Sequence, residues 1–248
     1  MMISVVICSI DPVKFDAVSR QYARLLAAGP FEIIHIPDAR GLAEGYNRGL
    51  ARSRGDVIIF SHDDIEVLTP DLRDRLLNHL DSADLLGVAG TTRLRDARWV
   101  GSAPPYIYGQ IAETNRERNC FDVSLWGVPA RRVDGIQAMD GVFLCAKRSV
   151  VDAVPFDAET FDGFHCYDID FTFRAYLAGK RLAVCNDIHL IHASTGSFNE
   201  QWVAAARRLH ARHEAHLADA GRREFRAAMV RVYTREQIVE VMTPPHWK

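Results

Sequence analysis

Apolar and polar positions alternate along the first half of the chain in a regular rhythm of short and long segments. Short runs rich in β-branched residues predict strands, and longer stretches with helical spacing between them predict helices. The expected strands cover 3–9, 31–36, 57–60 and 85–89, and the expected helices cover 13–28, 42–54 and 72–80. This alternation is typical of βαβ units and favours an α/β fold with a mostly parallel sheet flanked by helices.

The second half is less regular. Residues 91–132 contain Pro104-Pro105, two tyrosines and two tryptophans without a sustained period, so they are expected to form irregular, substrate-facing loops. Apolar character returns at 136–146, a helix is expected at 148–154, another at 167–178 and a strand at 181–185. From residue 199 onward the pattern is helical. We therefore expect a main domain over 1–198 and a C-terminal helical extension over 199–248, packed on or beside it.

Composition narrows the class of protein further. The 248 residues are 48% hydrophobic and 25% charged, with a net charge of −2, which is typical of a folded protein and gives no reason to expect nucleic-acid binding. Five scattered cysteines without a C-x-x-C pair indicate a reducing compartment. The apolar start lacks a basic region and meets Asp11 early, so neither a signal peptide nor a membrane span is expected. These features favour a cytoplasmic location.

Two adjacent carboxylates follow the third expected strand, in Ser61-His62-Asp63-Asp64. In open α/β sheets, ligands collect beyond the carboxyl ends of the strands. Paired acids there suit a divalent cation that bridges the oxygens of a diphosphate, because hard cations prefer oxygen ligands. The alternative is an ordinary turn that ends in a helix N-cap.

A second acidic pair, Asp168 and Asp170, opens the helix expected at 167–178. Residues two apart do not share a helical face, and Asp170 has the spacing to pair with Arg174. Asp168 is then the freer carboxylate, near the positive end of the helix, where it could accept a proton from an attacking hydroxyl. The alternative is a simple N-cap aspartate.

Histidines supply a third candidate in His189-Leu-Ile-His192. A histidine after an extended segment could add a nitrogen ligand to the same cation, and imidazole shifts the preference from Mg²⁺ toward Mn²⁺. A structural or exposed histidine is the alternative. By contrast, His210, His213 and His216 lack the spacing of a metal-binding helix and are expected on a solvated helix face.

Taken together and in this order, the motifs carry a resemblance. His62-Asp-Asp-Ile-Glu66, Tyr167-Asp-Ile-Asp-Phe171 and His192-Ala-Ser194 resemble the signature of family 2 glycosyltransferases of the GT-A fold, in their bacterial glycosyltransferase-like branch. The similarity covers about residues 3–196. It implies a Rossmann-like mixed sheet and transfer of a sugar, with inversion, from a nucleotide-diphosphate donor such as a UDP-sugar. The acceptor implied is a hydroxyl of a cell-surface glycan or of a lipid-linked molecule.

The resemblance also implies roles for individual residues. Asp64 and His192 match the positions that bind Mn²⁺ or Mg²⁺, and Asp168 matches the general base. The donor-binding positions that it implies are Ser9, Asp38, Asn47, Asp63, Asp140 and Gly141, with Asp63 near the ribose and Asp38 near the nucleobase. Tyr167 and His62 stand where the wider family has acids, which leaves the donor sugar undetermined.

Other expectations concern surfaces and rival functions. Trp99, Tyr106, Tyr108 and Trp126 would offer aromatic faces to sugar rings. Nine basic and six acidic residues from 199 onward give a mildly basic tail that could touch the inner face of a membrane. A sugar-phosphate nucleotidyltransferase is disfavoured because Asp11-Pro-Val-Lys14 is not a Gly-rich basic signature. A sugar-nucleotide binding module without catalysis remains the main alternative, and the sequence does not indicate an oligomeric state.

Overall fold

The N-terminal half forms the strands and helices that its hydrophobic pattern predicts. The structure is a computed structural model that describes residues 1–127, 130–194, 196, 198–219 and 227–247. Strands β1 (Ile3–Cys8), β2 (Phe31–Ile36) and β3 (Val57–Ser61) alternate with helices α1 (Pro12–Leu25) and α2 (Leu42–Arg52). Asp11 caps α1 through its carboxylate, which accepts from the backbone N–H of Val13 at 2.8 Å.

These strands belong to a mixed sheet with the order β2-β1-β3-β11-β5-β12-β9. Its other members are β5 (Leu85–Gly87), β9 (Arg132–Asp134), β11 (Phe143–Lys147) and β12 (Leu182–Cys185). Strand β1 pairs parallel with both β2 and β3, whereas β11 is antiparallel to both β3 and β5. The predicted α/β fold with a mixed sheet is confirmed, and the parallel order predicted for the first strands holds.

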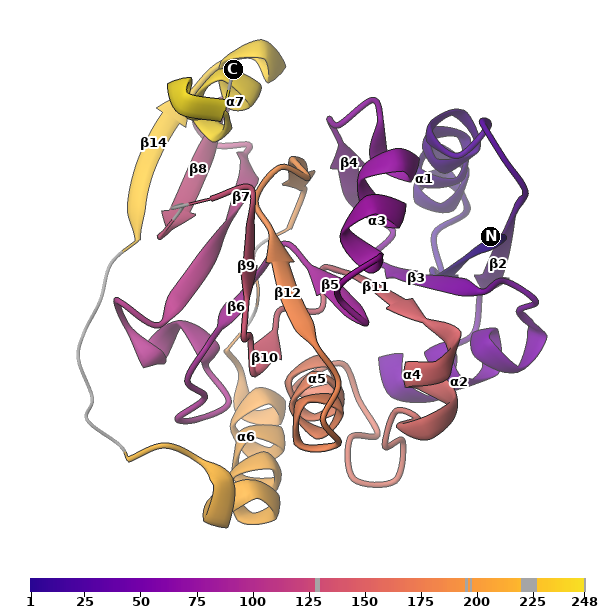
Figure 1. The fold of residues 1–248 in the computed structure, drawn as a ribbon, viewed down its shortest axis with the longest axis vertical. Helices are drawn as coiled ribbons and strands as arrows, with labels where there is room; N and C mark the ends of the chain where they lie inside the picture. Colours follow the sequence, from indigo (N-terminus) through magenta and orange to yellow (C-terminus); the bar gives the residue numbers. More distant parts are fainter. Residues whose placement is uncertain (128–129, 195, 197, 220–226, 248) are drawn as a thin grey trace.

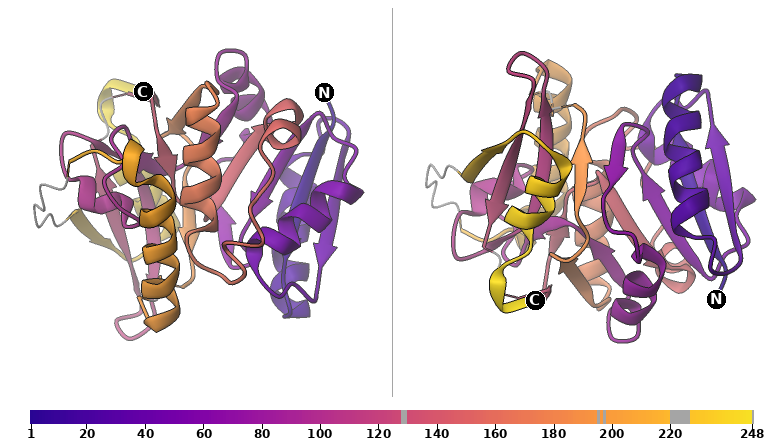
Figure 2. Two further views of the ribbon diagram at one scale, coloured as in Figure 1. Left: turned by 90° about the horizontal axis from the view of Figure 1, so that it is seen from below. Right: turned by 90° about the horizontal axis from the view of Figure 1, so that it is seen from above.

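Helices cover both faces of this sheet (Figures 1 and 2). Helices α1 and α3 (Leu72–Leu80) lie on one face, and α2, α4 (Arg148–Ala153) and α5 (Tyr167–Leu177) lie on the other. Close packing of α2 depends on its glycines: a Cβ on Gly49 would overlap Val6 Cγ1, and one on Gly45 would lie 2.5 Å from Cys8 Sγ. The absence of side chains at these two positions thus allows α2 to pack closely against β1.

A second sheet has the order β10-β6-β7-β13-β4. Its strands are β4 (Ile65–Val67), β6 (Ala89–Thr91), β7 (Ile107–Asn115), β10 (Ala138–Met139) and β13 (Leu190–His192), and β8 (Cys120–Trp126) pairs with β7. The prediction of irregular loops over 91–132 is wrong, because β7 and β8 form a long antiparallel hairpin. Polar residues hide its alternation. Gln110, for instance, is buried in β7 and donates to the carbonyl of Met242 at 2.8 Å.

The C-terminal segment combines helices with a strand. Helices α6 (Glu200–His213) and α7 (Arg235–Met242) agree with the predicted helical tail, but β14 (Ala228–Val232) does not. Strand β14 pairs antiparallel with β8, with Val230 opposite Val123. The prediction that the whole tail is helical is therefore wrong for residues 228–232. These residues form a strand because they pair with the edge of β8 (Figure 1). The boundary at 198/199 stays a prediction.

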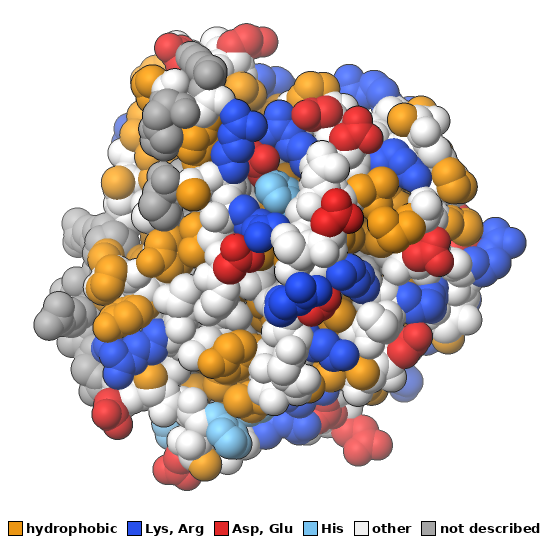
Figure 3. All heavy atoms as spheres, viewed as in Figure 1, with side chains coloured by type: hydrophobic (Ala, Val, Ile, Leu, Met, Phe, Trp, Pro, Cys, Tyr) orange, Lys and Arg blue, Asp and Glu red, His pale blue; other side chains and the backbone are white. Residues whose placement is uncertain are grey.

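The remaining features concern the surface and short turns. Within the described ranges, 3₁₀ turns cover Trp99–Ser102, Glu214–His216 and Pro245–Trp247. Basic and acidic side chains are interspersed over the face seen in Figure 3, which fits the near-neutral net charge. Among the described residues, no helix is both long and apolar enough to cross a membrane.

Candidate active site

The site is built at the carboxyl ends of β1 and β3, which lie side by side in the first sheet. Ser9 follows β1, and its hydroxyl donates to Asp63 Oδ2 at 2.6 Å. Lys14, in the first turn of α1, places its Nζ 4.0 Å from Asp63 Oδ1. Strand pairing thus brings Ser9 and Asp63 together, and the carboxylate of Asp63 is turned toward the end of β1.

Asp64 points the other way, into a cluster with two histidines. Strand β13 pairs antiparallel with β4, which sets His192 opposite Ile65, and the N–H of Ala193 donates to the carbonyl of Asp64 at 2.9 Å. His192 Nε2 lies 3.2 Å from Asp64 Oδ1 and 3.3 Å from His62 Nδ1. His62, Asp64 and His192 can each direct one ligand atom so that all three atoms lie within 4.8 Å of one another.

Burial and mutual charge set the ionisation of this cluster. Burial opposes ionisation of Asp64, but hydrogen bonding to His192 and the charge of that residue outweigh it and hold the pKa of Asp64 below its usual value. Burial also opposes protonation of His192, yet Asp64 raises the pKa of that imidazole. Burial and the nearby His192 lower the pKa of His62. One carboxylate and two imidazoles form a donor set that suits Mn²⁺, so the residues present fit a divalent cation.

His62 is the member of this cluster that sequence reasoning missed, since it was noted only as a replacement for an acid. A signal was available. His62 directly follows β3, at the carboxyl end of the strand where ligands collect, so its position was the available signal. The histidine of the His189-x-x-His192 pair that joins the cluster is His192. His189 lies buried elsewhere, and its backbone N–H donates to Thr69 Oγ1 at 2.8 Å.

Asp168 lies in the first turn of α5, next to Tyr167. Its Oδ2 accepts from the backbone N–H of Gly141 at 2.7 Å. Burial, and then the negative charge of Asp140, raise the pKa of Asp168 to about 7. The helix is capped at Cys166 rather than at Asp168, so the alternative of a simple N-cap aspartate is wrong. Asp170 pairs with Arg174 at 2.7 Å, as its spacing predicts.

Tyr167 joins the histidine cluster to the helix that carries Asp168. Its hydroxyl lies 3.1 Å from His62 Nε2, and 3.5 Å from the carbonyl oxygen of Gly141. Gly141 has no room for a side chain, because a Cβ there would overlap the Tyr167 hydroxyl and would lie 2.7 Å from Asp168 Cβ. The tyrosine that replaces an expected acid is therefore a structural link between the two halves of the site.

Asp140 precedes this glycine and is held from two directions. Its Oδ2 accepts from the indole N–H of Trp99 at 3.1 Å, and its Oδ1 accepts from the backbone N–H of Val142 at 3.0 Å. Trp99 is only 7% exposed, so its expected role as an open aromatic face for a sugar ring is wrong. Tyr106 is also covered, since the guanidinium of Arg93 lies 5.1 Å from the centre of its ring.

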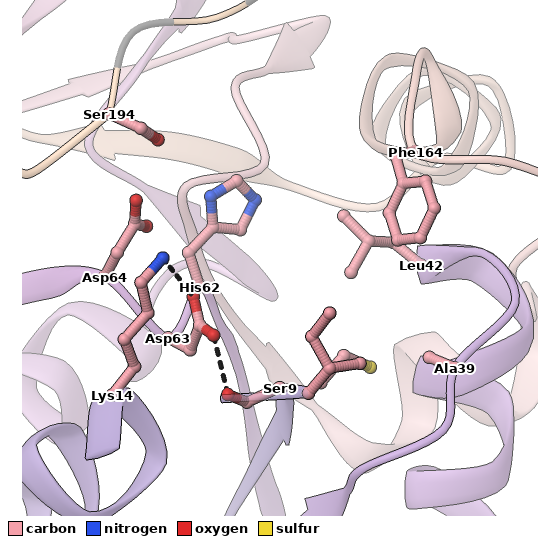
Figure 4. Close-up of a pocket in the computed structure, with 11 residues that line it drawn as sticks. Ser9, Lys14, Ala39, Leu42, His62, Asp63, Asp64, Phe164 and Ser194 are labelled. Atoms are coloured by element: carbon pink, nitrogen blue, oxygen red, sulfur yellow. Dashed lines mark hydrogen bonds and ion pairs between the residues drawn. The ribbon is translucent and has the colours of Figure 1, made fainter. Parts of the chain in front are cut away.

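A pocket of about 320 Å³ opens beside Ser9, Asp63 and Asp64. Figure 4 shows Asp63, Asp64 and His62 on one side, with Leu42 and Phe164 across the opening. The residues that line it are Cys8, Ser9, Ile10, Lys14, Ala39, Leu42, His62, Asp63, Asp64, Phe164 and Ser194. The pocket has an acidic, cation-competent side and an apolar side, which are the two surfaces that a nucleotide with its diphosphate requires.

Four expected donor-binding residues lie outside this lining, namely Asp38, Asn47, Asp140 and Gly141. Asp168 and His192 also lie outside it. The carboxylate of Asp38 is 71% exposed and pairs with Arg48 at 2.9 Å, and this pair lowers the pKa of Asp38. The side-chain amide of Asn47 donates to the carbonyl of Phe156 at 2.8 Å and accepts from the N–H of Phe156 at 3.2 Å. In this structure Asn47 therefore fixes the chain before α5.

The comparisons agree with the class that the fold and the site define, a glycosyltransferase of the GT-A type. The sequence model described as "Glycosyltransferase like family" matches residues 4–229. This chain belongs to that glycosyltransferase-like family, and the resemblance expected from the HDDIE, YDIDF and late histidine motifs is confirmed. No curated protein matches the chain.

Solved structures share the fold at low sequence identity. The mannosyltransferase PcManGT from Pyrobaculum calidifontis, in complex with GDP-Man and Mn²⁺, superposes with a TM-score of 0.51 at 11% identity. That match covers 88% of this chain and 65% of PcManGT. A mycobacterial protein gives a TM-score of 0.50 at 16% identity over 89% of this chain and 76% of its own. S. aureus TarS with UDP gives 0.49 at 14% identity, over 85% and 65%.

Proposed function

We propose that this protein is a metal-dependent inverting glycosyltransferase that transfers a sugar from a nucleotide-diphosphate donor, such as a UDP-sugar, to a hydroxyl group. The acceptor we propose is a cell-surface glycan or a lipid-linked molecule. The observation that carries the proposal is the convergence of His62, Asp64 and His192 beside a pocket at the carboxyl ends of β1 and β3. Mn²⁺ or Mg²⁺ is the proposed cofactor.

The cation would be held by Asp64 and the two imidazoles, and when bound it would neutralise the charge of the leaving diphosphate. Ser9, Lys14 and Asp63 form the neighbouring polar wall of the pocket. The carboxylate of Asp63 can accept hydrogen bonds from the hydroxyls of a ribose, and the hydroxyl of Ser9 can donate or accept one. The apolar side formed by Leu42 and Phe164 can exclude water from the bound donor.

Asp168 supports the inverting step. The oxygen of the acceptor hydroxyl would form a bond to the anomeric carbon on the face opposite the diphosphate, and the bond from that carbon to the diphosphate oxygen would break. The hydroxyl proton would pass to Asp168, and the nucleoside diphosphate would leave with the bonding electrons. A carboxylate whose pKa is raised to about 7 by burial and by Asp140 is a stronger base than an exposed aspartate.

A panel of nucleotide sugars tests the proposal directly. The melting temperature is measured with UDP- and GDP-sugars, each with Mn²⁺ and with EDTA. The expected result is a rise in melting temperature with one class of donor, larger with Mn²⁺. Transfer or slow hydrolysis of that donor is then followed by release of the nucleoside diphosphate. Binding without either reaction would make this protein a non-catalytic binding module and would refute the proposed activity.

Location is a separate proposal. We propose that the protein is cytoplasmic, with peripheral contact at the inner face of the membrane through the basic C-terminal segment. Fractionation of cells that express the full chain, with and without a high-salt wash, tests this contact, because an electrostatic association is released by salt.

A further inference from the structure

A second pocket lies behind the aromatic side of the active site. It has a volume of about 350 Å³ and is formed between α6 and the segment that leads into α5. Phe164, which is 54% exposed, lines this pocket and also the active-site pocket, so one aromatic ring separates the two. The full lining is Arg40, Asp162, Gly163, Phe164, His165, Gln201, Ala204, Ala205 and Arg208.

Three ties fix the walls of this pocket. The N–H of Leu42 donates to the carbonyl of Gly163 at 3.0 Å, which joins the segment before α2 to the segment before α5. Arg208 pairs with Asp162 at 3.2 Å. One turn further along α6, Arg212 lies 3.2 Å from the buried carboxylate of Asp170 in α5. The pocket is therefore part of the folded framework that carries Asp168.

Its chemistry combines an apolar floor with a basic rim. Phe164 and the alanines of α6 supply the apolar surface, while Arg40 and Arg208 approach from two different elements. Among the described residues, no hydrogen bond or ion pair engages the guanidinium of Arg40. Asp162 is the one acid in this lining and pairs with Arg208. One carboxylate, which is itself 76% exposed, balances the charge of two arginines only in part. Guanidinium groups recognise carboxylates and phosphates through paired hydrogen bonds.

The position of the pocket identifies what it would serve. The wall from 163 to 165 runs directly into α5, whose first turn carries Asp168. The donor side of the site, with its cation-competent cluster, lies on the other side of Phe164. A molecule in the second pocket would therefore lie beside the segment that leads into α5, and Phe164 would separate it from the donor side of the site. This is the position that we assign to an acceptor.

We propose that this second pocket is an acceptor subsite for a saccharide that carries an anionic group, a carboxylate or a phosphate, held by Arg40 and Arg208. The apolar face of the sugar ring packs on Phe164. The proposal rests on the proposed transferase function for its biological meaning, but the binding that it predicts requires no donor and no catalysis.

The test is an NMR titration of the full-length protein, without metal and at constant ionic strength. The probes are glucose, glucuronate and glucose 1-phosphate, which share a ring and differ in charge and in the type of anion. The dissociation constants for one or both anionic sugars are expected to be at least tenfold lower than for glucose. If glucuronate binds more tightly, the natural ligand carries a carboxylate, and if glucose 1-phosphate binds more tightly, it carries a phosphate.

Variants locate the effect. Arg40→Gln removes a charge that makes no ion pair with the described residues, so it is expected to fold normally and to abolish most of the preference. Arg208→Gln is expected to act in the same direction. Arg207→Gln is the matched control, because it removes the same charge from an exposed neighbour on α6 that lines a different pocket, and it should keep the preference.

Equal binding of all three sugars to the native protein would overturn the subsite, as would a preference that survives Arg40→Gln. Failure of the transferase proposal is seen separately, as absence of donor binding and donor hydrolysis by the native protein. A preference that depends on Arg40 and Arg208 supports the subsite in either case.

Discussion

Replacement of Asp168 by asparagine should make the protein more stable while it abolishes transfer. The asparagine side chain would keep the shape of the aspartate and an oxygen that accepts the Gly141 N–H, but it would not ionise. In the native protein, burial and Asp140 raise the pKa of Asp168 from 3.8 to about 7. The native state therefore binds a proton more tightly than the unfolded state does, so the stabilisation is complete below about pH 4 and is lost as the pH rises through about 7.

The size of this effect follows from the two pKa values. Between low and high pH, the native protein loses about 4 kcal/mol of unfolding free energy through ionisation of Asp168, and about 3 kcal/mol of this loss falls between pH 5 and pH 8. Asp168→Asn does not lose this stability, because asparagine does not ionise. The gain in its free energy of unfolding over that of the native protein should therefore be about 3 kcal/mol larger at pH 8 than at pH 5.

Urea denaturation at both pH values, in EDTA, measures this double difference. Asp152→Asn is a matched control, since it removes an exposed carboxylate on α4 and should show almost no such difference. Transfer by Asp168→Asn should fall by about 10²-fold or more with donor binding unchanged, and native kcat should rise with pH through about 7.

Two results would refute this reasoning. A double difference near zero would show that ionisation of Asp168 does not destabilise the folded state. If Asp168→Asn is more stable than the native protein at pH 8 but still transfers sugar, Asp168 is buried as described but another group is the base.

Three further predictions concern the framework of the site. Gly141→Ala should lower stability by about 1–3 kcal/mol in urea denaturation, because its Cβ would clash with the Tyr167 hydroxyl. The double variant Asp64→Ala, His192→Ala should lose the rise in melting temperature caused by Mn²⁺ together with transfer, and activity without metal in this variant would contradict the metal role. Asp170→Ala should cost about 3–5 kcal/mol of unfolding free energy, because it removes the buried carboxylate that contacts Arg174, Arg212 and His213, and a loss below about 1 kcal/mol would argue against the buried network.

The local pattern of the chain was sufficient to predict the βαβ start of the fold. Strands β1, β2 and β3 are short runs rich in apolar and β-branched residues, and α2 lies between β2 and β3 in the chain as the pattern predicts. The hairpin of β7 and β8 was missed because buried polar residues such as Gln110 break the alternation, and their cost is met by hydrogen bonds to distant carbonyls. Strand β14 was missed because its pairing with β8 is a property of the sheet edge, not of its own sequence.

The same distinction holds for single residues. His213 was expected on a solvated helix face, but it is 3% exposed and lies 2.9 Å from Asp170, because α6 packs against α5 (Figure 2). Its spacing with other histidines excluded a zinc site, but the helix pattern did not predict its buried partner. A hydrogen bond between two elements can be seen only when their packing is known.

By itself, the sequence determined strands β1, β2 and β3, the polar residues that follow them and the chemistry those residues can perform, because these depend on periodicity and residue type within short segments. The tertiary structure decided which of them meet. His192 is 130 positions from His62, and the register of β13 on β4 brings their rings together. Likewise, the pKa of Asp168 is raised to about 7 because the fold buries this carboxyl group beside Asp140, and no local pattern in the chain encodes that environment.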